Sequence, residues 1–118
     1  MNHPLPDEIR LPGDKTALLL RYGNADYHLS AELLRVYSPS AEVRGHGVGQ
    51  EVLQTGKRQV RITELEPAGN YALKITFSDG HDSGLFDWDY LYHLATEQDT
   101  LWQDYLQRLQ QAGASRDL

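Results

Sequence analysis

Short apolar runs alternate with turn-forming residues near the N-terminus. The runs cover Ile9–Leu11, Ala17–Arg21 and Tyr27–Leu29, and the residues between them include Gly, Pro, Asn and Asp. Runs of this length and spacing are typical of β-strands joined by tight turns. The pattern predicts a three-stranded antiparallel meander.

A short helix is predicted directly after this meander. Ser30 is a favourable N-cap for a helix through Ala31–Arg35, and Pro39 disfavours helical geometry at Ser38. Ser38 and Ser40 are therefore expected at the exit of this helix. The glycine-rich segment Arg44–Gly56 shows little periodicity and predicts an irregular connection.

A second group of strands follows this connection. Apolar and polar residues alternate in Val60–Glu66, and a Pro-Ala-Gly-Asn turn comes next. They alternate again in Tyr71–Phe77, which places Tyr71 on the apolar face of a strand. Asp79-Gly80 is a favoured two-residue hairpin turn, so Ser83–Phe86 is predicted to return beside the preceding strand. The turn would hold His81 rigidly.

The remaining sequence is helical in pattern. Asp87 is a good N-cap, and apolar residues follow it at helical spacing. Thr96 marks a second helix start, Gly113 a helix end, and the final Ala-Ser-Arg-Asp-Leu a frayed tail. We expect one α+β domain over residues 1–118, with a core at about 9–113, in which small antiparallel hairpins and a meander pack on one or two C-terminal helices.

Length and composition support a single small domain. The chain has 118 residues, no cysteine and a mean hydropathy of -0.57. The longest apolar run, Ala17–Leu20, is far shorter than the roughly 20 residues of a membrane span. The N-terminus lacks the pattern of a secretory signal, so we expect a cytoplasmic protein. Missing cysteines exclude disulfides, thiol catalysis and thiolate metal sites.

The distribution of charge along the chain argues against some classes of binding partner. The formal net charge is -6, and no Lys or Arg occurs between Asp79 and Asp104. Such a segment repels phosphate backbones and anionic lipid, which argues against nucleic acid and membranes as partners. We expect Tyr90 or Tyr92 to be exposed beside these acids, where it would suit a basic protein partner or self-association as a homodimer.

Two stretches together resemble a known family. The segment NYALKITFSDGHDSGLFDWDYL, preceded by SPSAEVRGHG and followed by LWQDYLQRLQQAGASRD, is similar to the N-terminal domain of gamma-butyrobetaine hydroxylase. The resemblance runs from about Ile9 to Gly113. In that hydroxylase and in trimethyllysine dioxygenase the domain is expected to bind a structural zinc through three cysteines and a histidine.

The resemblance also implies that the zinc site has degenerated here. The cysteine positions correspond to Ser38, Ser40 and Val43, and the histidine to His81. A serine hydroxyl stays protonated near neutral pH and valine offers no donor, so we expect no cofactor. We expect the serine hydroxyls to bond to backbone or to His81, and Val43 to pack inward.

The residues and the resemblance together suggest a non-enzymatic accessory or protein-interaction module. Related domains fused to Mrp-type iron-sulfur carriers suggest a link to iron-sulfur or other metal-cofactor assembly. The candidate site is centred on His81. Its members are Ser38, Ser40, Arg44, His46, Asp79 and His81.

Two chemical alternatives remain for these residues, and a third is excluded. His81 and His46, with Asp79 or Glu42, could form a metal-binding or metal-delivery site. A serine near His81 could act as a nucleophile, although the chain has no G-x-S-x-G motif. No histidine has an acid two residues later, so the iron-binding motif of 2-oxoglutarate oxygenases is missing.

Overall fold

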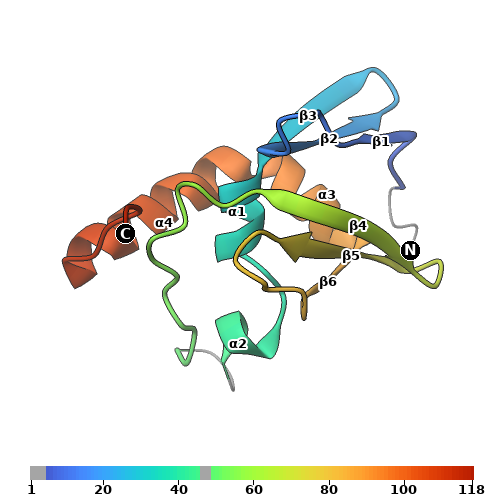
Figure 1. The fold of residues 1–118 in the computed structure, drawn as a ribbon. Helices are drawn as coiled ribbons and strands as arrows, with labels where there is room; N and C mark the ends of the chain where they lie inside the picture. Colours follow the sequence, from blue (N-terminus) through green and yellow to red (C-terminus); the bar gives the residue numbers. More distant parts are fainter. Residues whose placement is uncertain (1–4, 46–48) are drawn as a thin grey trace.

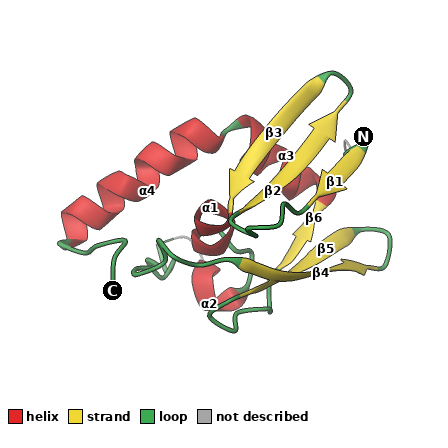
Figure 2. Cartoon of the chain, turned by 45° about the horizontal axis from the view of Figure 1, so that its top comes forward, coloured by secondary structure: helices red, strands yellow, loops and turns green. Residues whose placement is uncertain are grey.

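A computed structural model describes residues 5–45 and 49–118 of the chain. It contains two three-stranded antiparallel sheets and four helices in these residues (Figures 1 and 2). The α+β fold class predicted from the sequence is confirmed. None of the described helices has both the length and the apolar character needed to cross a bilayer.

The first sheet is the predicted meander, with strand order β1-β2-β3. Its register pairs Ile9 with Leu20 and Leu18 with Leu29, so the apolar side chains of β2 meet those of both neighbours. The strands are β1 (Glu8–Arg10), β2 (Ala17–Tyr22) and β3 (Ala25–Ser30).

The second sheet has strand order β4-β5-β6. Its central strand carries the buried Leu73, Ile75 and Phe77, as the alternation predicts. Tyr71 precedes this strand and is 57% exposed, so its assignment to the apolar face was wrong. The strands are β4 (Ile62–Ala68), β5 (Ala72–Phe77) and β6 (Leu85–Asp87).

The turn after β5 is longer than predicted. The Phe77 N–H donates to the His81 carbonyl and the Gly80 N–H donates to the Phe77 carbonyl, both at 2.9 Å. Three residues, Ser78–Gly80, therefore reverse the chain, with Gly80 at a φ of +89° that a glycine adopts without strain. The prediction of a two-residue turn was wrong, but the turn still fixes the backbone of His81.

The helix ends follow the predicted capping residues. The Ser30 hydroxyl accepts from the Leu33 N–H at 3.0 Å, and the Asp87 carboxylate accepts from the Tyr90 N–H at 2.7 Å. Gly113 ends the last helix in the left-handed conformation. The short helix α2 was not predicted. The helices are α1 (Ala31–Val36), α2 (Ala41–Arg44), α3 (Trp88–Thr96) and α4 (Gln98–Ala112).

One main core joins both sheets with α1 and α3. A smaller cluster of Val36, Tyr105 and Leu109 attaches α4 to α1. Figure 2 shows α4 extending away from the two sheets. The main core includes Leu18, Leu20, Leu29, Leu34, Ile62, Ile75, Phe77, Phe86, Leu91 and Leu94.

The C-terminal tail is bound to the domain, which contradicts the prediction that it frays. Figure 1 shows the C-terminus beside the segment that leads into β4. In this segment the Gly56 N–H donates to the Ser115 carbonyl and the Arg58 N–H to the Arg116 carbonyl, both at 3.0 Å. The Arg116 side chain bonds both carboxylate oxygens of the buried Glu32, at 2.7 and 2.8 Å.

Candidate functional site

Two loops meet at the positions to which the family resemblance assigns a degenerate zinc site. Ser38 lies between α1 and α2, and His81 follows the turn after β5. The Ser38 hydroxyl lies 2.8 Å from Nε2 of His81. Ser38 is 1% exposed and the His81 side chain 3% exposed. We call residues 38–43 together with residues 79–84 the knuckle.

Both nitrogens of the His81 ring have partners. Nδ1 lies 3.3 Å from the Glu42 carboxylate, while Nε2 faces Ser38. A neutral ring with its proton on Nδ1 satisfies both contacts, because Nδ1–H donates to Glu42 and Nε2 accepts from the Ser38 hydroxyl. Burial lowers the pKa of His81, as does the nearby Arg35 charge, against the opposing effect of Glu42 and Asp79. The neutral form is thus favoured.

Asp79 supports the turn that carries His81. Its carboxylate accepts from Arg35 at 2.8 Å, from Lys57 at 2.7 Å and from the backbone N–H of His81 at 3.2 Å. Burial alone would raise the pKa of Asp79, but these hydrogen bonds and the Arg35 charge outweigh it and lower the pKa to about 2. Asp79 therefore acts as a charged anchor between the turn, α1 and the segment before β4.

Gly84 allows the two loops of the knuckle to approach. A Cβ atom at this position would lie 2.3 Å from the Ser38 hydroxyl oxygen and 3.1 Å from Cδ of Pro39. Any side chain there would push Ser38 away from His81. Packing therefore requires a glycine at position 84, the last residue of the Asp-Gly-His-x-Ser-Gly segment.

The knuckle does not fit a structural zinc ion. Val43 is 7% exposed and packs inward, as expected, and it has no donor atom. The Ser38 hydroxyl is already bonded to His81, and the Ser40 N–H donates to it at 3.3 Å. The Ser40 hydroxyl is buried without a hydrogen-bond partner in the described residues, so the expectation of bonded hydroxyls was wrong for Ser40.

The proposed His81–His46 metal pair cannot be placed, because His46 lies outside the described residues. Within the described part of the chain, no three His, Asp or Glu side chains are grouped so that they could hold an ion. Glu42 does approach His81, but it does so as a hydrogen-bond acceptor on one ring nitrogen.

Ser38, His81 and Glu42 have the order of contacts found in a serine-hydrolase triad. A nucleophile must nevertheless reach a substrate, and the Ser38 hydroxyl is enclosed by Gly84 and Pro39. The chain of hydrogen bonds is therefore suited to joining two loops, and it has no accessible attacking oxygen.

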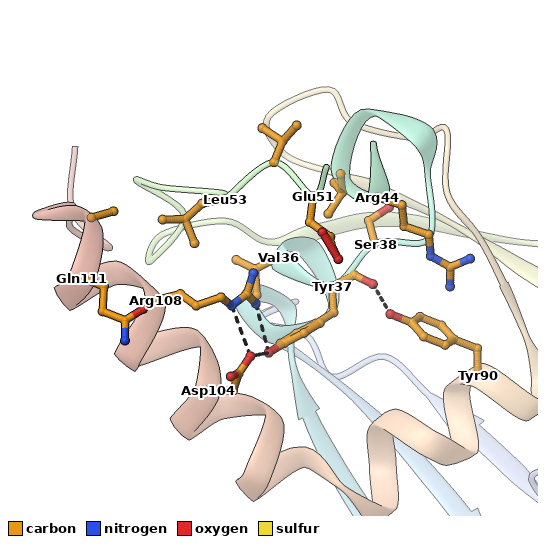
Figure 3. A pocket seen from close by; sticks show the side chains of 13 residues that line it. Val36, Tyr37, Ser38, Arg44, Glu51, Leu53, Tyr90, Asp104, Arg108 and Gln111 are labelled. Carbon is orange, nitrogen blue, oxygen red and sulfur yellow. Dashed lines mark hydrogen bonds and ion pairs between the residues drawn. The ribbon is translucent and has the colours of Figure 1, made fainter. Parts of the chain in front are cut away.

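A pocket opens on the other side of the α1–α2 connection. Its volume is about 600 Å³, and it lies between that connection, the extended segment 51–53 and α4 (Figure 3). Val36, Val43, Val52 and Leu53 give it apolar walls. The polar and aromatic lining comes from Tyr37, Ser38, Arg44, Glu51, Tyr90, Asp104, Arg108 and Gln111.

Arg44, a predicted site residue, belongs to this pocket. Its guanidinium lies over the Tyr90 ring, 4.9 Å from the centroid. Tyr90 is held in turn because its hydroxyl donates to the Tyr37 carbonyl at 2.5 Å. Both Tyr90 and Tyr92 are half-buried, so the expectation of an exposed tyrosine is not met.

The structure brings Ser38, Asp79 and His81 together, and sequence reasoning missed the residues that support them. Arg35 and Lys57 looked like ordinary surface cations, because nothing local indicates a partner more than twenty residues away. Tyr90 follows the Asp87 cap at the third helical position, and only the packing of α3 against α1 shows that it faces the pocket.

Comparisons with known proteins agree with the resemblance seen in the sequence. One protein solved by NMR is 58% identical with a TM-score of 0.87, and the alignment covers 98% of this chain and 92% of that one. A second NMR structure is 49% identical with a TM-score of 0.79, covering 96% and 85%.

A crystal structure from Acidithiobacillus ferrooxidans, of a protein of unknown function in the DUF971 family, is 33% identical with a TM-score of 0.64 and covers 79% and 94%. A search of curated proteins finds no match. The family model described as gamma-butyrobetaine hydroxylase-like, N-terminal, matches residues 9–92, and the chain belongs to this family.

Proposed function

We propose that this domain is a non-enzymatic accessory module that binds another protein through the pocket beside the knuckle. The observation that carries the proposal is the contrast between the two sites. Ser38, the nucleophile-like residue, is only 1% exposed although it lines the pocket, whereas the pocket of about 600 Å³ is itself open and partly apolar.

The lining of the pocket supports protein binding. Val52 is 52% exposed and stands beside the half-buried Leu53 and Tyr37, so water contacts apolar side chains at the pocket wall. Apolar side chains surrounded by arginine and aromatic groups are characteristic of protein interfaces. The pocket walls come from α1, α2, α3 and α4, and the knuckle and the core hold these helices together.

The alternative of metal delivery by His81 and His46 has weaker support. Both ring nitrogens of His81 are engaged, so a metal would have to displace either Ser38 or Glu42. The link to iron-sulfur or metal-cofactor assembly, and a cytoplasmic setting for it, rest on the family resemblance. In this proposal they describe the partner's role and not a metal held by this chain.

Selection of peptides from a random display library on the immobilised domain tests the proposal. Selected peptides should shift the NMR signals of pocket residues, and Val52→Asp should abolish their binding. Leu85→Asp is the matched control, because Leu85 is also an exposed apolar residue, at 41%, and does not line the pocket. Peptides that shift only signals outside the pocket, or no enrichment at all, would refute the proposal.

A further inference from the structure

We infer that the pocket binds a segment of a partner protein in which an acidic residue stands beside a bulky apolar residue, with the carboxylate on Arg44 and the apolar side chain on the wall formed by Val43 and Leu53. This inference rests on the proposed function. It adds the chemistry of the occupant to the location of the surface.

Among the described residues that line the pocket, Arg44 is the cation without a carboxylate partner. Arg108 already has a carboxylate partner, Asp104, at 3.2 Å, and it also donates to the Tyr37 hydroxyl at 3.2 Å. In the described residues Arg44 has no carboxylate within ion-pair distance, and its side chain is held by Tyr90, through the ring and by a hydrogen bond. A guanidinium stacked on an aromatic face keeps its N–H edge free for a planar carboxylate.

The position of Arg44 is prepared for such a contact. Tyr90 supports the guanidinium from one side, and the Tyr90 hydroxyl is fixed to the backbone of Tyr37. Figure 3 shows Arg44 and Tyr90 at one side of the pocket and Arg108 with Asp104 at another. A side chain that is already ordered loses less conformational entropy when it binds.

Glu51 is the competing charge, because it lines the same pocket and could attract a basic segment. Glu51 is exposed and lies on a segment without regular secondary structure, and Figure 3 draws no hydrogen bond or ion pair from its carboxylate to another residue lining the pocket. Arg44, by contrast, ends a helix and is stacked on a ring that is itself anchored. The better-ordered charge favours an acidic occupant.

The apolar part of the occupant follows from the wall beside Arg44. Val43 precedes Arg44 in α2, and the Val52 N–H donates to the Val43 carbonyl at 2.8 Å, so segment 51–53 is tied to that helix. Val43 and Leu53 line the same pocket as Arg44, and Figure 3 shows Leu53 across the pocket from the Arg44 guanidinium. Burying one large apolar side chain there gives affinity that a surface ion pair alone cannot supply.

Parallel display selections on the wild-type domain, on Arg44→Gln and on Glu51→Gln test the inference. The wild type and Glu51→Gln should enrich peptides with Asp or Glu beside a large apolar residue, and Arg44→Gln should not. One selected peptide is then synthesised, and its affinity for the domain is measured. Replacing its acidic residue by the amide, or introducing Arg44→Gln into the domain, should each weaken binding about tenfold. The NMR signals of Tyr90 should shift when the peptide is titrated into the wild-type domain. Arg44 is exposed, so the variant should fold, which its amide spectrum verifies.

The outcomes separate this inference from the proposed function. The selection could instead yield basic or neutral peptides that bind in the pocket, and whose binding is lost in Glu51→Gln or unchanged in Arg44→Gln. This result would overturn the acidic occupant but would leave the proposed protein-binding function standing. Failure of every selected peptide to perturb pocket signals would overturn both.

Discussion

The hydroxyl of Ser38 lies 2.8 Å from Nε2 of His81, across 43 residues of sequence. The bond joins the loop after α1 to the turn after β5 at a point where both side chains are almost fully buried. The family resemblance implies a metal between these two loops in related domains. In this chain a neutral hydrogen bond with well-packed surroundings makes the connection.

Loss of either partner should destabilise the domain. Ser38→Ala leaves the buried Nε2 without a donor and should cost about 1–3 kcal/mol. His81→Ala should cost more, since it also leaves a cavity. In a double-mutant cycle measured by urea unfolding, the double variant should lose at least about 1 kcal/mol less than the sum of the two single variants.

The control for this cycle is Ser83→Ala. Ser83 is exposed and makes a single long contact of 3.4 Å to Glu42, so its removal should change stability by less than about 0.5 kcal/mol. Additive losses for Ser38→Ala and His81→Ala would show that the hydrogen bond does not couple the loops.

Restoring thiols should restore a zinc site if the knuckle descends from one. The triple variant Ser38→Cys, Ser40→Cys and Val43→Cys would surround His81 with three thiolates, the donor set that suits tetrahedral zinc. Native mass spectrometry should then find one zinc per chain, and adding His81→Ala should remove it. A folded triple variant that takes up no zinc would contradict the assignment of these positions.

Local signals in the sequence predicted most elements of the fold. Ser30 and Asp87 both cap helices, and the alternation of Leu73, Ile75 and Phe77 predicts the buried face of β5. Such signals depend on a few neighbouring residues. They do not extend to the Ser78–Gly80 turn, where two- and three-residue loops have nearly the same composition.

The network around the site could not be predicted, because its partners are distant in sequence. Arg35 and Asp79 are 44 residues apart, and Glu32 and Arg116 are 84 apart. Each of these residues is typical of a solvated surface when seen alone. Only the family resemblance, not any periodicity, connected Ser38 with His81.

Asp79 should make stability fall at acid pH. Its pKa is about 2 in the folded protein against 3.8 in the unfolded chain, so the unfolded chain takes up a proton first as the pH falls. The stabilisation is present above pH 3.8 and is lost as the pH falls toward 2. It should amount to about 2 kcal/mol, on the scale of 1.36 kcal/mol per pKa unit.

Urea unfolding of the wild type and of Asp79→Asn between neutral and acid pH measures this contribution. The variant should be less stable at neutral pH, and its stability should fall less steeply over the acid range. Equal slopes for the two proteins would show that Asp79 is not the anchor inferred from its bonds to Arg35 and Lys57.

The C-terminal tail should contribute to stability through Arg116. Arg116→Ala would leave Glu32, whose side chain is 6% exposed, without its two hydrogen bonds. Removing one member of a buried ion pair costs about 3–5 kcal/mol, and we expect about 2–3 kcal/mol here since the Arg116 side chain is 27% exposed. Urea unfolding measures the loss.

Two further variants separate the charge pair from the packing of the tail. Asp117→Ala breaks the exposed pair with Arg58, and it should change stability by less than about 0.5 kcal/mol. Glu32→Gln combined with Arg116→Met removes both charges together and should recover part of the loss, because no buried charge is then left unpaired. If Arg116→Ala were as stable as the wild type, the ion pair between Arg116 and Glu32 would not contribute to the stability of the domain.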